Sequence, residues 1–419
     1  MPEEQKQQLE QQLWNIANEL RWKMSADQFR DYILGFIFYK YLSEKLVIKA
    51  DKLLEDEGVK YEKIDENSVE WKDYLKAIKE DTIWDLGYFL KPSELFSEIS
   101  KKWNSKSENS ETNFILGDLI NILKNIENST TGTESEEDFI WLFEDLDLTH
   151  PKLGRSEEQK NELISRVLAH LDKIDFKLQN TELDVLWDAY EYLIAKFASW
   201  AWKQAWEFYT PQDVSKILDK IVTLNKTQIK SVYDPTCGSG SLLLRVAKEV
   251  KYTNQVQFFG QELNRTTFNL ARMNMILHDD GHTNVISHDG LDDIEKMAKI
   301  NLWFKANSFK YIFTNPPFWA IIKKSASDYL DKFEFWKKDW KKTRPAQKSE
   351  ILFIESIHAF LKEGWRCAVV LPDGILTNSS LLYVREWILE HFKLLWVISL
   401  TQDAFKYFWA WVKSSILVL

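Results

Sequence analysis

The stretch SVYDPTCGSGSLLLRV, residues 231–246, decides the fold. Its first four residues have strand-like character, a turn with Gly238 and Gly240 follows, and an apolar helical pattern comes next. This order of strand, glycine turn and helix allows the backbone to approach a bound ligand closely. Asp234 ends the strand with a negative charge, which suits a ligand ammonium group better than a pyrophosphate. A glycine turn alone is a weak indication, so the neighbouring segments must support it.

Short apolar runs alternate with helical patterns after this stretch. They are VQFFGQE, YIFTN, WRCAVVLP, LLWVISL and SSILVL. Such alternation is typical of parallel βαβ units, so we expect an α/β protein with an open, doubly wound, Rossmann-like sheet whose ligands bind at the carboxyl ends of the strands. The preceding part of the chain shows helical periodicity and little strand pattern, as in FRDYILGFIFYKYLSEKL. We therefore predict a helical domain over residues 8–150 and a sheet-containing domain over residues 165–419.

The strand after the glycine turn indicates a nucleoside ligand. VQFFGQE ends in Glu262, about 20 residues beyond the turn, where a carboxylate can accept hydrogen bonds from two ribose hydroxyls. Asp289, in HDG after the strand-like NVIS, can accept a hydrogen bond from the ligand's adenine. The alternatives are a solvated carboxylate at Glu262 and a plain Asp-Gly turn at Asp289. Because Asp234 suits an ammonium group, S-adenosylmethionine fits better than NAD or FAD.

The run TNPPF, residues 314–318, discriminates best between functions. Pro316 and Pro317 fix the backbone, so that the Asn315 amide and the Pro316 carbonyl can both point into a pocket. Both groups can accept hydrogen bonds from an exocyclic amine and make its nitrogen more nucleophilic, while Phe318 offers a face for stacking. We expect a planar heterocycle with an amino group as substrate, flipped out if it comes from duplex DNA. The alternative is a Pro-Pro loop without a function.

Composition limits the remaining possibilities. The net charge of −10 argues against a protein that grips nucleic acid with its whole surface. Cys237 and Cys367 are too few for a disulfide framework, and Cys237 lacks a nearby base that would make it a nucleophile. The seven histidines show no metal-ligand spacing, so we expect no metal. The polar N-terminus and the absence of a long apolar run predict a cytoplasmic protein that does not enter a membrane.

A run of cations, KKDWKKTRPAQK, follows the NPPF segment at residues 337–348. We expect it to form a loop. Its position makes it a candidate phosphate contact, and the alternative is a solvated run of charges.

FYTP, DPTCGSG, GQE and NPPF occur in this order, and the chain resembles the modification (M) subunit of type I restriction-modification systems, an N6-adenine DNA methyltransferase. The resemblance runs from about residue 10 to the end. It implies a seven-stranded S-adenosylmethionine-dependent methyltransferase fold behind an all-α N-terminal domain. It also implies double-stranded DNA, a specificity (S) subunit, a second M subunit and a restriction (R) subunit as partners.

The resemblance assigns roles to individual residues. The segment expected to pack against the methionine part of the cofactor comprises Phe208, Tyr209, Thr210 and Pro211. The methionine moiety itself would be held by Asp234, Thr236, Gly238, Ser239 and Gly240. Glu262 would bind the ribose and Asp289 the cofactor adenine. The target adenine would be held by the catalytic segment Asn315, Pro316, Pro317 and Phe318.

Two departures from the family pattern bear on this interpretation. The sequence stops at Leu419, directly after SSILVL, where the family continues into a C-terminal helical region, so we expect a missing tail. This departure raises the alternative of a truncated or non-catalytic family member. A separate alternative is a methyltransferase that acts on another planar nitrogen, such as a glutamine amide or an RNA base, because segments of the NPPF type serve those substrates too.

The second departure is that 19 Trp exceed 13 Gly, with three Trp in ASWAWKQAWEFYTP alone. Family members typically have glycine where this chain has Trp22, Trp141, Trp187, Trp200, Trp202, Trp206, Trp319, Trp365, Trp409 and Trp411. Our hypothesis is that the gene comes from a lineage that decodes UGA as glycine, whereas the written sequence translates UGA as tryptophan. Trp14 and Trp84 look ordinary.

Overall fold

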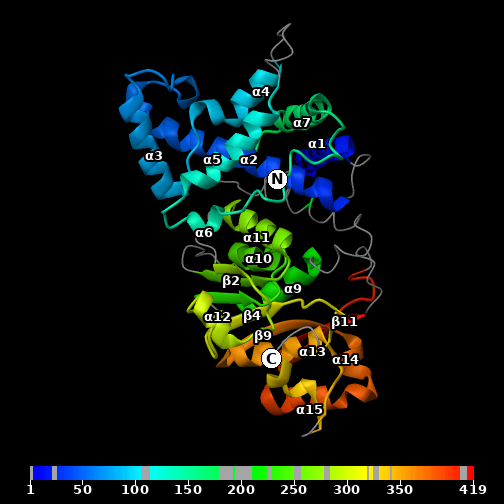
Figure 1. Cartoon of the computed structure of the whole chain (residues 1–419). Coiled ribbons are helices and arrows are strands. Elements are labelled where there is room, and N and C mark those ends of the chain that lie inside the picture. The colour runs from blue at the N-terminus through cyan, green and yellow to red at the C-terminus, as the bar shows by residue number, and fades with distance from the viewer. Residues whose placement is uncertain are drawn as a thin grey trace. The chain divides into compact units, whose positions relative to one another are not determined.

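The computed structural model describes most of the chain. The described residues are 3–20, 26–104, 114–176, 178, 192–193, 210–224, 229–249, 256–277, 284–318, 320–323, 330–339, 342–405 and 413–419. The chain divides into two compact units, which we name the helical unit, Met1–Ala201 with Ile276–His282, and the sheet unit, Trp202–Met275 with Thr283–Leu419. Figure 1 shows the helices of the first unit in blue to cyan-green and the strands of the second in green to red.

The helical unit is built from α-helices and short 3₁₀ turns. They are α1 Glu3–Leu20, α2 Ala26–Leu53, α3 Lys72–Leu86, α4 Phe96–Asn104, α5 Leu116–Ser129, α6 Glu136–Phe139 and α7 Glu157–Asp172, with the 3₁₀ turns η1 Glu55–Glu57, η2 Tyr61–Lys63 and η3 Pro92–Glu94. The long helix α2 forms the centre, because Phe29, Ile33, Phe36 and Ile37 on it are at most 2% exposed. It packs against α1, α3, α4 and α7, as its apolar helical pattern predicts.

One residue of the helical unit has an unusual backbone. Trp141, which follows α6, has φ 58, in the left-handed region that bulky L-residues avoid. Its side chain is 56% exposed, so burial does not explain why an indole stands there. The backbone at this position favours glycine, which agrees with the decoding hypothesis for this tryptophan.

The other suspected tryptophans give no comparable information. Trp22, Trp187, Trp200, Trp202, Trp206, Trp319, Trp409 and Trp411 lie outside the described residues. Trp365 packs edge-on against Tyr311, with ring centroids 5.3 Å apart, and the Lys310 ammonium lies 4.5 Å from its ring centroid.

The sheet unit alternates strands and helices as the sequence predicts. Its strands are β1 Ser231–Asp234, β2 Gln257–Glu262, β3 Asn284–Ser287, β4 Phe309–Thr314, β5 Ile321–Lys323, β6 Lys337–Asp339, β7 Lys342–Thr343, β8 Ala346–Lys348, β9 Leu361–Pro372, β10 Trp396–Ser399 and β11 Ser414–Val418. Its helices are α9 Gln212–Thr223, α10 Ser241–Glu249, α11 Arg265–Leu277, α12 Ile294–Ile300, α13 Ser349–Phe360, α14 Asp373–Thr377 and α15 Leu382–His391, with the 3₁₀ turns η8 Leu330–Lys332, η9 Glu334–Trp336 and η10 Ser379–Leu381. A helix predicted over ELDVLWDAYEYLIAKFAS falls almost wholly outside the described residues.

Within the described part of the chain, seven strands form one sheet in the order β10-β11-β9-β4-β1-β2-β3. β1 pairs in parallel with both β2 and β4, so the chain winds outward in two directions from β1. β11 runs antiparallel to β9 and β10, which the short apolar pattern of SSILVL did not reveal. The predicted doubly wound seven-stranded fold behind an all-α region is confirmed.

Helices cover both faces of this sheet (Figure 1). α10 packs against β1, β2 and β4, and α9 against β9, while α13 contributes to a core cluster on the sheet with Tyr233, Phe259 and Phe309. The carboxyl ends of β1 and β4, at the point where strand order reverses, are where an open α/β sheet binds its ligands. Within the described ranges, no helix combines the length and apolar character that crossing a bilayer requires.

Candidate active site

Asp234 stands at the carboxyl end of β1 and is 2% exposed. Its Oδ1 accepts a hydrogen bond from the Thr236 backbone N–H at 2.9 Å. The Thr236 hydroxyl lies 2.7 Å from the hydroxyl of Thr314, the last residue of β4. These contacts tie the loop after β1 to the end of its neighbouring strand, so the two predicted motifs meet at the switch point of the sheet.

The glycine turn has the backbone that its sequence predicts. Gly238 has φ 56 and Gly240 has φ 76, values that glycine adopts readily and other residues rarely do. Ser239 between them is 3% exposed, and its carbonyl accepts a hydrogen bond from the Asn274 amide at 2.6 Å. The turn therefore depends on its glycines, and the hydrogen bond from Asn274 fixes it to α11.

Cys237 in the same turn is buried and packs against β2. A Cβ at Gly260 would lie 2.8 Å from the Cys237 sulfur, so only glycine allows this approach. Burial raises the pKa of the Cys237 thiol well above its ordinary value, which keeps it protonated. This environment gives no support to a nucleophilic role and agrees with our rejection of one.

Glu262 ends β2 and is 7% exposed. Its Oε1 accepts a hydrogen bond from the Asn264 backbone N–H at 2.7 Å. Burial raises the pKa of Glu262 to about 7, and burial together with the nearby Glu262 charge raises the pKa of Asp234 to about 7 as well. Two buried carboxyl groups of this kind are suited to a ligand that brings a positive charge and hydroxyl donors.

A pocket of about 450 Å³ opens beside Glu262. It is lined by Pro235, Thr236, Gln261, Glu262, Leu263, Asn264, Asp289, Gly290, Leu291, Pro317, Ala320, Ile322, Ser349 and Phe353. Asp289 follows β3, lines this pocket, and its Oδ1 accepts a hydrogen bond from the Leu291 N–H at 2.9 Å. The structure therefore brings residues from four predicted motifs into one cavity: the β1 loop, the β2 end, the segment after β3 and the NPPF segment.

The NPPF segment follows β4 directly. The Asn315 Nδ2 donates a hydrogen bond to the Thr210 Oγ1 at 3.2 Å, whereas the Asn315 Oδ1 is buried and has no partner in the described structure. Pro316 is buried, and the Pro317 carbonyl accepts a hydrogen bond from the Ser349 hydroxyl at 2.9 Å. A buried acceptor without a partner costs free energy, so the site is suited to a donor supplied by a ligand.

Phe318 and the FYTP segment are only partly defined. Phe318 is 3% exposed and packs edge-on against Phe405, so its stacking role stays a prediction. Thr210 and the buried Pro211 precede α9, whereas Phe208 and Tyr209 lie outside the described residues. The cofactor contacts expected of these four residues therefore stay predictions.

No motif in the sequence predicted that several of the residues lining the pocket would lie there. Ser349, Phe353, Ala320 and Ile322 line the cavity, but no spacing rule connects α13 with the NPPF segment. Ser349 reaches Pro317 from the first turn of α13, 32 residues further along the chain. Only the packing of α13 against the sheet shows this proximity.

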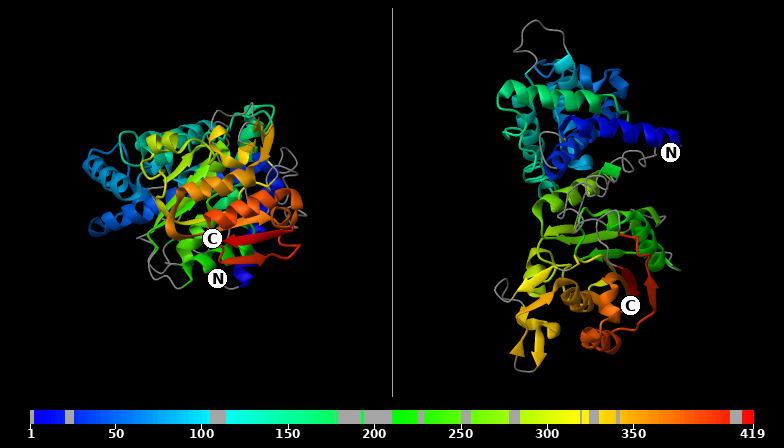
Figure 2. Two further views of the ribbon diagram at one scale, coloured as in Figure 1. Left: turned by 90° about the horizontal axis from the view of Figure 1, so that it is seen from below. Right: turned by 90° about the vertical axis from the view of Figure 1, so that its right-hand side faces the viewer.

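We had expected the cationic run after NPPF to form a loop, but it forms short strands. β6 and β7 form a hairpin, and β8 pairs with β5. The β6–β7 hairpin, yellow-orange in Figure 2, projects from the sheet unit. The Arg344 guanidinium lies 4.5 Å from the Tyr383 ring centroid, and Lys337 is exposed. Phosphate contact by this run stays a prediction.

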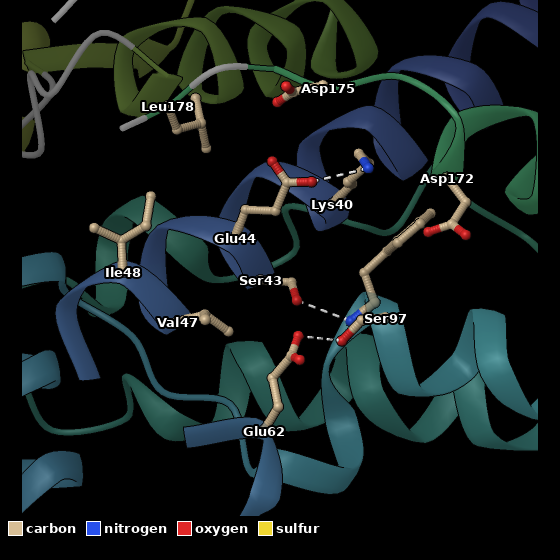
Figure 3. Close-up of a pocket in the computed structure, with 11 residues that line it drawn as sticks. Lys40, Ser43, Glu44, Val47, Ile48, Glu62, Ser97, Asp172, Asp175 and Leu178 are labelled. Atoms are coloured by element: carbon tan, nitrogen blue, oxygen red, sulfur yellow. Dashed lines mark hydrogen bonds and ion pairs between the residues drawn. The ribbon is translucent and has the colours of Figure 1, made fainter. Parts of the chain in front are cut away.

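The helical unit contains a separate pocket of about 530 Å³ between α2, η2, α4 and the end of α7 (Figure 3). Its lining includes Glu44, Glu62, Asp172 and Asp175. The single lysine, Lys40, is 4% exposed and forms an ion pair with Glu44 at 2.8 Å. This acidic lining disfavours phosphate, so we assign the pocket no part in nucleic-acid binding.

Comparison with known proteins gives consistent matches. The family model described as N-6 DNA Methylase matches residues 181–419, and the HsdM N-terminal domain model matches residues 9–171. A type I restriction enzyme MpnII methylase subunit from Mycoplasma pneumoniae is 32% identical over 99% of this chain and 77% of its own length. The MjaIX methylase subunit from Methanocaldococcus jannaschii is 26% identical, and the match covers 74% of this chain but about half (51%) of that relative.

A solved structure agrees with these matches. The crystal structure of the type I restriction-modification system methyltransferase subunit from Streptococcus thermophilus is 32% identical, has a TM-score of 0.81, and is matched over 99% of this chain and 84% of that chain. The similarity therefore extends through both units.

Proposed function

We propose specific roles for the site residues from one premise: the chain belongs to the N-6 DNA methylase family, as a type I restriction-modification methylase subunit, and is an adenine-specific DNA methyltransferase. The premise fixes the reaction class. It leaves open the methyl donor, the contacts to the target base and the partners.

The methyl donor that suits the carboxyl groups of this site is S-adenosylmethionine. Asp234 would pair with its ammonium group, Glu262 would accept hydrogen bonds from its ribose hydroxyls, and Asp289 would accept one from its adenine. The support is the pair of buried carboxyl groups with raised pKa values, because a cation and two hydroxyl donors would stabilise their charged forms. When bound, this cofactor would supply an electrophilic methyl group carried on a sulfonium sulfur, and the amine nitrogen that takes the methyl group would release one proton.

The observation that carries the target assignment is the buried Asn315 Oδ1, which has no hydrogen-bond partner among the described residues. This oxygen and the Pro316 carbonyl would accept the two N–H bonds of the adenine N6 amine. The lone pair of that amine is delocalised into the ring, and two acceptors aimed at its protons favour a more tetrahedral and more nucleophilic nitrogen. The acceptors are held in place before the reaction, which is the arrangement that stabilises developing positive charge. The target base must leave the duplex to reach this position.

The proposed partners follow from the family and from the charge. An acidic chain with a net charge of −10 is a poor general binder of DNA, so we assign part of the DNA grip to a specificity subunit. A second methylase subunit and a restriction subunit would complete the assembly on double-stranded DNA. Because the substrate is cellular DNA, we keep the cytoplasm as the expected location. For the domains we keep the predicted division into residues 8–150 and 165–419.

A methyl-transfer assay tests this proposal. The chain, co-purified with a specificity subunit, should transfer tritiated methyl groups from S-adenosylmethionine to plasmid DNA, and N6-methyladenine should be the product. Asn315→Ala should lower the single-turnover rate by about a hundredfold or more, the effect of removing one preorganised polar group. Cofactor binding without transfer would support the non-catalytic alternative. Transfer to RNA or to a glutamine amide would support the other alternative.

A further inference from the structure

Thr210 and Asn315 come from segments 105 residues apart, yet their side chains form a hydrogen bond. The donor is the Asn315 Nδ2 and the acceptor is the Thr210 Oγ1, at 3.2 Å. The other end of the same amide, Oδ1, is buried and has no partner in the described structure. An asparagine amide has its donor and acceptor atoms on opposite sides, so the Asn315 nitrogen that is hydrogen-bonded to Thr210 leaves the oxygen directed away from Thr210.

Both ends of this hydrogen bond are attached to backbone that cannot move freely. Thr210 precedes Pro211, which restricts Thr210 to extended backbone conformations. Pro211 is buried, and its carbonyl accepts a hydrogen bond from the Ser215 N–H at 2.9 Å, so it is fixed to the first turn of α9. Thr210 therefore presents its hydroxyl from a rigid position.

Asn315 is fixed on its own side as well. It directly follows β4, and Pro316 and Pro317 come next, which limits its backbone. The Pro317 carbonyl accepts a hydrogen bond from the Ser349 hydroxyl at 2.9 Å, which fixes the loop from α13. The remaining freedom is rotation of the Asn315 side chain, and the Thr210 hydroxyl is the group that restricts it.

We propose that Thr210 is a positioning residue, which acts on the reaction by holding the Asn315 amide so that its carbonyl oxygen faces the target amine. This inference rests on the proposed function of Asn315. It differs from the role that family resemblance gives the FYTP segment, which is contact with the methionine part of the cofactor. A cofactor contact affects cofactor affinity, whereas a positioning residue affects the rate of the bound complex.

The test compares Thr210→Val, which keeps the shape and removes the hydroxyl, with Thr210→Ser, which keeps the hydroxyl. Thr131→Val, at an exposed threonine of the helical unit, is the matched control. For each variant we would measure kcat, the KM for DNA and the dissociation constant of sinefungin, a non-reactive analogue of the cofactor. Thermal melting would confirm that each variant is folded.

We expect Thr210→Val to lower kcat by about tenfold, because the Asn315 nitrogen loses its partner. The dissociation constant of the analogue should stay within about twofold, and Thr210→Ser should recover most of the activity. An unchanged kcat, or weaker analogue binding as the main effect, would overturn the inference, and so would a serine variant as slow as the valine variant. Wild-type protein that transfers no methyl group to adenine would instead refute the proposed function.

Discussion

Cofactor affinity should depend on pH in a direction set by Asp234 and Glu262. In the free protein both carboxyls are buried, and the pKa of each is raised to about 7 from ordinary values of 3.8 and 4.5. The proposed cofactor contacts need both groups as carboxylates, because an ammonium and two hydroxyls are donors. Binding below pH 7 must therefore expel protons from the site, and acid should weaken it.

The size of the effect follows from proton linkage. Each carboxyl that must lose a proton lowers affinity by up to about tenfold per pH unit below its pKa, which is about 1.4 kcal/mol per unit. With both groups involved, affinity should fall by up to about a hundredfold per unit between pH 6.5 and 5.5. Above about pH 7 this dependence should level off, until the cofactor's own amino group titrates near pH 8.

Calorimetric titration with sinefungin checks this. At pH 6, buffers of different ionisation enthalpy should report between one and two protons released per ligand bound. Glu262→Gln, which cannot hold a titrating proton, should bind more weakly at pH 7.5 and should release about one proton fewer at pH 6. An affinity that stays flat between pH 5.5 and 7 would refute the reasoning, because the carboxyls would then bind the ligand without changing their protonation.

The same pKa values set the sign of a stability effect in the free protein. A raised carboxyl pKa means that the folded state holds protons which the unfolded chain has already released at about pH 4. The free protein should therefore lose stability as pH rises from about 4 to 7, the opposite of the usual contribution from paired carboxylates. Saturating cofactor should reduce this loss.

Two further predictions concern glycine positions. Gly290→Ala should weaken analogue binding and lower the melting temperature, because its Cβ would lie 2.4 Å from the Pro235 carbonyl oxygen at the rim of the pocket; Gly374→Ala, whose Cβ meets nothing within 4 Å, is the control and should do neither. Urea unfolding tests the assignment of Trp141, whose backbone φ is 58. The free energy of unfolding of Trp141→Gly should exceed that of Trp141→Ala by about 1 kcal/mol. At Trp84, inside α3, the alanine variant should be the more stable one by a similar amount. The same order at both positions would contradict the assignment of Trp141 as a glycine position.

The sequence was informative where chemistry directly follows a buried strand. Asp234, Glu262 and Asn315 each follow or end such a strand, and parallel strands bring their carboxyl ends to one edge, so their proximity was predictable. The contacts that depend on packing were not. Ser349 reaches Pro317 through the position of α13, and Thr210 reaches Asn315 across the start of α9.

The local sequence pattern did not predict the direction of the strands either. β11 carries five buried residues in a row, which fits any interior strand whichever way it runs. Its antiparallel pairing with β9 and β10 becomes visible only in the register of the assembled sheet. Similarly, the two short antiparallel strand pairs within residues 321–348 were not predicted, because charged residues at short spacing occur in loops as well as in exposed edge strands.

The most direct test of the central claim is the identity of the methylated atom. Plasmid DNA treated with the chain, its specificity subunit and S-adenosylmethionine would be digested to nucleosides and analysed by mass spectrometry, with Asn315→Ala in parallel. The account predicts N6-methyladenine from the wild-type protein and at least about a hundredfold less from the variant. N6-methyladenine formed equally well by both proteins, or no methylated adenine from a wild-type protein that binds the cofactor, would contradict it.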